Sequence, residues 1–184
     1  MLGYIMFQPF IIIMDQWNRQ YSDFTLYYRM LMNFHIQMRP GMEKDCNILE
    51  WVAFASNAFN VLVPFYATID TTPDYFSSTT REVTTDSFYW VSRMIGAMAD
   101  ASYKSSIFHI ERYQERVMSK GHQLIGKYDA LLEKESDAAK RMSLRHQANQ
   151  EIADMVKKEA SDTLNKVLYE LSNQMKNAYS RSDA

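Results

Sequence analysis

Residues 48–67 read ILEWVAFASNAFNVLVPFYA, and this stretch decides the class of fold. Two apolar runs rich in aromatic and branched side chains, 48–55 and 59–67, flank a short polar break at residues 56–58. Such a pattern is typical of two antiparallel strands joined by a hairpin turn. Pro64 has no amide hydrogen to donate, so we expect the second strand to lie at an edge of the sheet or at a bulge.

Further strands are predicted upstream of this hairpin. Residues 33–39 alternate between apolar and polar side chains and stop before a Pro-Gly pair, which predicts a strand with one apolar face. That face would carry Phe34, Ile36 and Met38. Residues 10–14 (FIIIM) are branched and apolar and predict a buried strand.

The period of the sequence changes near Asp86, where apolar residues begin to recur at helical spacing. We expect a first helix from that point, an interruption at residues 105–106, and a second helix that ends before a turn at 135–137. A third helix is expected over residues 138–178. The two long helices should pair antiparallel and bury their apolar stripes on each other or on the sheet.

Composition excludes several classes of function. The chain has 184 residues and a formal net charge of -2, which argues against nucleic acid or an anionic membrane as a main partner. Residues 1–14 are apolar but too short to span a bilayer, and they lack the flanks of a signal peptide. The single cysteine, Cys46, excludes an internal disulfide and suits a reducing compartment, so we expect a cytoplasmic protein.

No complete catalytic site is visible in the sequence. Cys46 lies between Lys44–Asp45 and Asn47 without a nucleophile motif, which favours a structural thiol at the surface or half-buried. None of the four histidines lies three or four residues from another, and no glycine-rich phosphate loop is present, so neither a metal nor a cofactor is expected.

The polar break of the hairpin offers the best candidate for chemistry. Side-chain amides of Asn57 and Asn60, placed between two apolar strands, could face a cleft and donate to a developing oxyanion. Asparagine is equally at home in such a turn because it tolerates left-handed backbone geometry. Residue type alone leaves both interpretations open.

Four strings resemble the C-terminal region of the C69 (formerly U34) dipeptidases: the 48–67 stretch, FYWVSR at 88–93, MADA at 98–101 and HIERYQER at 109–116. The resemblance covers roughly residues 34–184, and residues 1–33 match poorly. It implies an α+β fold that forms part of the αββα sandwich of N-terminal-nucleophile (Ntn) hydrolases. Antiparallel core strands would lie within 34–70 and long antiparallel helices within 86–184.

The resemblance also implies a mechanism and its residues. The family nucleophile is a cysteine at the start of the mature chain, whose α-amino group can act as base, and no residue here matches it; Cys46 corresponds to a loop after the family's Arg-Pro pair. Arg39 and Pro40 match that pair, and Asn57 matches the Asn of a Ser-Asn turn. Asn57 is therefore a candidate oxyanion or cleft residue, and Arg39 a candidate cleft residue.

The resemblance implies that the intact enzyme hydrolyses dipeptides or short peptides, and that this chain is its C-terminal part, inactive alone. A different class of function is a non-catalytic helical protein that associates with itself or with a partner. Charged residues are concentrated in the second half, beside two apolar helical stripes, which motivates that alternative. Pairing with a missing N-terminal half, or a homo-oligomer, is expected in either case.

Overall fold

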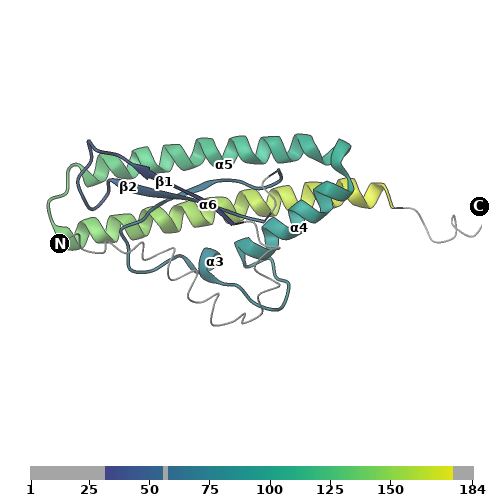
Figure 1. The fold of residues 1–184 in the computed structure, drawn as a ribbon, viewed down its shortest axis with the longest axis horizontal. Coiled ribbons are helices and arrows are strands. Elements are labelled where there is room, and N and C mark those ends of the chain that lie inside the picture. Colours follow the sequence, from purple (N-terminus) through teal and green to yellow (C-terminus); the bar gives the residue numbers. More distant parts are fainter. Residues whose placement is uncertain (1–31, 56–57, 176–184) are drawn as a thin grey trace, which may run out of the picture.

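The computed structural model describes residues 32–55 and 58–175, and it confirms the α+β class. An antiparallel sheet occupies the first part of the described chain and helices form the rest (Figure 1). The elements are β1 (Met32–Met38), β2 (Ile48–Phe54), β3 (Val63–Tyr66), α3 (Asp74–Ser77), α4 (Phe88–Ala101), α5 (Tyr103–Leu132) and α6 (Ala138–Asn173). The strand predicted at 10–14 lies outside the described residues.

The sheet has the order β1-β2-β3, with Met38 opposite Ile48 and Val52 opposite Val63. The strand predicted at 33–39 is confirmed as β1. Its apolar residues differ from those of β2 and β3 in being exposed, with 43% of Ile36 and 77% of Met38 accessible to solvent. β1 therefore pairs with β2 alone among the strands described, and its apolar face is not part of the core.

The opposite edge of the sheet, at β3, is closed by a side chain. Tyr66 N–H donates to Oδ1 of Asn149 at 2.9 Å, and Nδ2 of Asn149 donates back to the Tyr66 carbonyl at 3.0 Å. Pro64 shares the orientation of Tyr66, because outward and inward backbone groups alternate along an antiparallel edge strand. Its missing N–H therefore costs the sheet no hydrogen bond, and the edge position predicted for Pro64 is confirmed.

The two long helices run antiparallel beside the sheet, as predicted (Figure 1). Ion pairs show the direction: Arg116 of α5 meets Glu159 of α6 at 2.6 Å, while Lys127, later in α5, meets Glu151, earlier in α6, at 2.8 Å. α5 lies close against the sheet at Gly121, where a Cβ atom would come 3.1 Å from the Pro64 ring.

The helix boundaries differ slightly from the prediction. The break between α4 and α5 falls at Ser102 and not at residues 105–106, because the buried Ser102 and Ser106 hydroxyls bond each other at 2.6 Å within the new helix. The break predicted between the long helices is confirmed, although the turn itself lies at residues 133–134 and not at 135–137. Asp137 caps α6 by accepting from Lys140 N–H at 2.8 Å.

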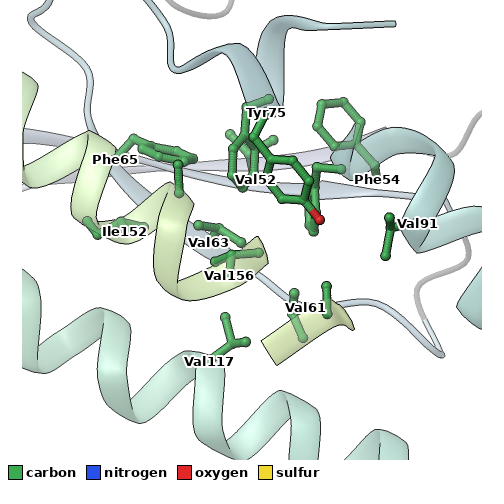
Figure 2. Packing of buried hydrophobic residues seen from close by; sticks show 14 of the residues in the cluster. Val52, Phe54, Val61, Val63, Phe65, Tyr75, Val91, Val117, Ile152 and Val156 are labelled. Atoms are coloured by element: carbon green, nitrogen blue, oxygen red, sulfur yellow. The ribbon is translucent and has the colours of Figure 1, made fainter. Parts of the chain in front are cut away.

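One core joins the sheet to the four helices of the described residues. Figure 2 shows Val52, Phe54, Val63 and Phe65 of the sheet together with Val91 of α4, Val117 of α5, and Ile152 and Val156 of α6. Phe76 of the short helix α3 stacks between Phe65 and Phe88, with ring centroids 4.7 and 4.4 Å away. This aromatic contact places α3, which no sequence pattern predicted, against the sheet.

Candidate functional site

The predicted turn lies at the end of the sheet where β2 stops. Asn57 falls outside the described residues, but the backbone on both sides of it is described. Ala55 has φ 67°, in the left-handed region that non-glycine residues rarely adopt. The chain thus leaves β2 through a sharp bend and returns through residues 58–62 to β3.

A cavity of about 470 Å³ opens beside this turn. Its walls come from β1, β2, the segment before β3, and α5, and the lining residues are His35, Ala53, Asn60, Val61, Leu62, Gln114 and Met118. We call residues 58–62 together with this cavity the cavity end of the sheet. The volume lies within the range of small-ligand pockets.

Asn60 is the most constrained polar residue at the cavity end. It is 7% exposed, and its Oδ1 accepts the Val61 N–H at 2.7 Å, which fixes the orientation of the amide. Nδ2 of Asn60 is buried and has no hydrogen-bond partner among the described residues. A buried donor without an acceptor lowers the stability of the folded chain by about 1–3 kcal/mol. This N–H group is therefore available to hydrogen-bond an acceptor on a ligand.

Gln114 of α5 holds the returning segment in place. Its Nε2 donates to the carbonyls of Asn60 at 2.8 Å and Ala58 at 3.3 Å. One helical side chain therefore fixes the segment that carries Asn60, across more than fifty positions of sequence.

Arg39 lies at the opposite end of the sheet, directly after β1. Its Nη1 donates to Oδ2 of Asp129 at 2.6 Å, another donor reaches the Cys46 carbonyl, and the guanidinium lies 5.7 Å from the ring centroid of Tyr66. The Tyr66 hydroxyl donates to the other Asp129 oxygen at 2.8 Å. Arg39 thus ties the β1–β2 loop to α5 in the described chain, and its predicted role in a cleft stays a prediction.

Asp45 completes this arrangement, which we call the ion-paired end (residues 39–47 with Asp129, Arg141 and Arg145). Both Asp45 oxygens are occupied by Arg141, at 2.6 and 2.8 Å, and Arg145 donates to one of them. Both guanidinium groups are buried. The hydrogen bonds from Arg141 and the positive charges of both arginines hold the pKa of Asp45 below its usual value, against the effect of burial.

Cys46 belongs to the ion-paired end and is more buried than predicted, at 1% exposure. Nη2 of Arg141 lies 3.6 Å from its Sγ. Burial, reinforced by the charge of Asp45, nevertheless raises the pKa of the thiol. A reactive cysteine needs a lowered pKa and access to substrate, so this environment is that of a structural thiol.

Glu50, in the middle of β2, is a buried residue that sequence reasoning missed. It is 2% exposed, it faces Ile36 of β1 and Phe65 of β3, and its Oε1 has no partner within the described part of the chain. Burial raises the pKa of its carboxyl to about 7. The alternation of β2 could have indicated an inward-facing carboxylate, but not that its neighbours would all be apolar.

The four histidines have different neighbours. His35 lines the cavity, and His109 lies 3.5 Å from Glu170. The His122 ring packs against Trp51 with centroids 5.1 Å apart, and His146 lies 2.6 Å from Asp70. Over residues 32–55 and 58–175, no group of three or more His, Cys, Asp or Glu side chains is placed to hold a metal ion. Within the same ranges, no helix has the length and apolar character needed to cross a membrane.

Comparison with known proteins gives one consistent result. Residues 25–116 match peptidase family C69, a range that contains the whole sheet, the turn and most of the cavity lining. A probable dipeptidase A of Streptococcus pyogenes serotype M18 is 36% identical over 80% of this chain, and a dipeptidase of Bifidobacterium longum is 34% identical over 80%. A probable dipeptidase B of Lactococcus lactis is 25% identical over the same share. The chain spans 30–35% of the length of these relatives.

Proposed function

The chain belongs to peptidase family C69, and from that premise we propose that it is part of a dipeptidase that hydrolyses short peptides through an N-terminal cysteine lying outside these 184 residues. The observation that carries the proposal is the 36% identity to a probable dipeptidase A across 80% of the chain. The chain corresponds to only 30% of that relative, which leaves ample sequence elsewhere for the nucleophile. We place the described sheet and helices within an αββα sandwich completed by the remainder of such an enzyme.

The proposed reaction is acyl transfer through a thioester. The cysteine thiolate attacks the peptide carbonyl carbon, the C–N bond breaks, and the leaving amine takes a proton from the ammonium form of the nucleophile's own α-amino group. Water then hydrolyses the thioester and frees the thiol. Cys46 does not suit the role of nucleophile, because its thiol is buried and its pKa is raised.

Asn57 is proposed to donate its side-chain amide to the oxyanion formed in each of these steps. Its support is positional: it lies in the turn between Ala55 and the segment that lines the cavity. Removing one such donor typically lowers kcat by about 10²–10³ with little change in KM. Arg39, which lies at the opposite end of the sheet from this turn, is proposed as a cleft residue of the intact enzyme that acts by holding the β1–β2 loop in position.

Reconstitution tests the proposal. The 184-residue chain is expected to show no dipeptidase activity alone. Activity should appear when it is co-expressed with the part of the Bifidobacterium longum dipeptidase that lies outside the match to this chain. Asn57→Ala should then lower kcat, whereas the same change at the exposed Asn165 of α6 should not. Hydrolysis by the 184-residue chain alone, abolished by Cys46→Ala, would refute the placement of the nucleophile.

A non-catalytic protein that associates with itself is the alternative, favoured by the exposed apolar residues of β1, Ile36 and Met38. Among the described strands β1 pairs with β2 alone, and an apolar row on such an edge strand is a common site of strand addition. Sedimentation would separate the two: the alternative requires a stable oligomer of the 184-residue chain that survives reconstitution with the dipeptidase segment. A cytoplasmic location is proposed for either function, because the single thiol suits a reducing compartment.

A further inference from the structure

We propose that the cavity end binds an uncharged peptide group that carries an apolar side chain. Identification of that ligand as one residue of a peptide substrate rests on the proposed function. The chemical class comes from three features of the residues that line the cavity: the buried, unpartnered Nδ2 of Asn60, the oxygen of the Gln114 carboxamide, and the apolar side chains beside them.

The donor is Nδ2 of Asn60. The amide cannot turn over to hide it, because Oδ1 accepts the Val61 N–H at 2.7 Å and a reversed amide would face that N–H with its own hydrogens. Nδ2 therefore remains a buried donor without a partner in the described chain. Its complement is a carbonyl oxygen, and we expect the Asn60 side chain to shift slightly when such an oxygen reaches it.

The acceptor is Oε1 of Gln114. Nε2 of the same carboxamide is committed to the carbonyls of Ala58 and Asn60, so the orientation of this amide is fixed too. Gln114 lines the cavity, and none of the described residues donates to its oxygen. Its complement is an N–H group. A carbonyl oxygen and an N–H together are the two hydrogen-bonding groups of a peptide unit.

The remaining walls select against charge. Ala53, Val61, Leu62 and Met118 provide apolar surface. His35 is the one ionisable residue of the described lining, which contains no Asp or Glu, so a cationic ligand side chain would lose its water without gaining a carboxylate as counter-ion. A cavity of about 470 Å³ has room for an apolar side chain together with its peptide group.

Binding can be measured without any catalysis. The 184-residue chain is titrated with N-acetyl-L-leucinamide, which presents one leucine between two amide groups, and NMR shifts are followed at residues 60–62 and 114–118. We expect saturable shifts with a Kd on the order of millimolar, as for other ligands of this size. N-acetyl-L-lysinamide should bind at least about tenfold more weakly, because of its charge.

Two variants test the cavity itself at pH 8. Asn60→Asp keeps an oxygen to accept the Val61 N–H and removes the free donor, so leucinamide binding should weaken about tenfold. Met118→Trp fills the cavity from α5 and should abolish binding without touching the amide. Asn165→Asp, the same chemical change at an exposed position of α6, is the matched control and should bind normally.

The outcomes are decisive in both directions. If Asn60→Asp does not fold, as judged by circular dichroism, Met118→Trp alone decides. Absence of saturable shifts, or unchanged affinity in every folded variant, overturns the inference. Leucinamide binding without dipeptide hydrolysis in the reconstituted assembly would defeat the proposed function and leave this site standing, whereas hydrolysis without leucinamide binding would do the reverse.

Discussion

At the ion-paired end of the sheet the Asp45 carboxylate accepts hydrogen bonds from two buried guanidinium groups, whereas at the cavity end the buried Nδ2 of Asn60 has no acceptor among the described residues. The two ends lie along the same helix, with Gln114 at one and Asp129 at the other, about 22 Å apart at 1.5 Å per residue. Long-range pairs such as Asp45 with Arg141 fix a loop to α6. The unpartnered Nδ2 of Asn60, by contrast, costs the unliganded chain stability that a ligand acceptor could restore.

The largest effect is expected from Asp45→Asn. Removing the carboxylate leaves the buried Arg141 and Arg145 without their counter-ion, which should lower the free energy of unfolding by about 3–5 kcal/mol in a urea titration. Glu43 also pairs with Arg141, at 3.4 Å, but its side chain is 74% exposed. Glu43→Gln should therefore cost less than about 1 kcal/mol. Equal losses of unfolding free energy in the two variants would show that the buried ion pairs of Asp45 do not stabilise this end of the sheet.

Glu50, between the two ends, is a carboxyl group without a guanidinium and should behave in the opposite way to Asp45. Its folded-state pKa of about 7 lies above the ordinary 4.5, so the unfolded chain releases this proton first. Stability should therefore fall as pH rises from 4.5 to 7, by up to about 3 kcal/mol, and then level off.

Glu50→Gln tests this directly. The variant should be more stable than the parent at pH 8 and nearly equal to it at pH 4.5, in urea titrations at both values. If the variant and the parent differ in free energy of unfolding by the same amount at both pH values, the Glu50 carboxyl has a hydrogen-bond or ionic partner that offsets its burial.

Two tyrosines give a smaller contrast of the same kind. The Tyr66 hydroxyl, at the ion-paired end, bonds Asp129 and the Ile125 carbonyl, whereas the buried Tyr113 hydroxyl has no partner among described residues. Tyr66→Phe should cost about 1–3 kcal/mol and Tyr113→Phe close to nothing, because only the first leaves a charged acceptor unpaired. Thermal unfolding of both variants measures the difference. A large loss for Tyr113→Phe would reveal a bound water on that hydroxyl.

The smallest effect concerns α5, the helix that joins the two ends. Gly126 has open space where a Cβ would lie, so Gly126→Ala should stabilise the chain by up to about 1 kcal/mol through helix propensity. Gly121→Ala should gain less or lose, since its Cβ would press on the Pro64 ring at 3.1 Å. If both substitutions raise the free energy of unfolding equally, α5 can shift away from Pro64 without loss of stability.

Local sequence patterns predicted most of the elements. Alternation in residues 33–39 and 48–55 correctly predicted two strands, and helical periodicity after Asp86 predicted the long helices. Pro64 predicted that β3 is an edge strand of the sheet. Helix α3 was missed because four residues are too few for any period. It exists because Phe76 packs between Phe65 and Phe88, a contact that depends on tertiary structure.

The site was harder to predict for the same reason. Turn chemistry singled out residues 56–60, but nothing local distinguishes Asn60, whose importance comes from Gln114 more than fifty residues later. Cys46 was expected nearer the surface because its neighbours are polar. It is buried because Arg141, 95 positions away, approaches its sulfur and neutralises Asp45 beside it.

The amide of Asn149, which occupies both outward backbone groups of Tyr66, has a consequence for assembly. A carboxamide presents the same donor and acceptor as a peptide unit. The Asn149 side chain therefore takes the place that a residue of a neighbouring strand would have beside Tyr66. Pro64, on the same edge of the sheet, has no backbone N–H to donate to another strand. Among the described strands, β1 therefore offers a further strand a better edge to pair with than β3 does.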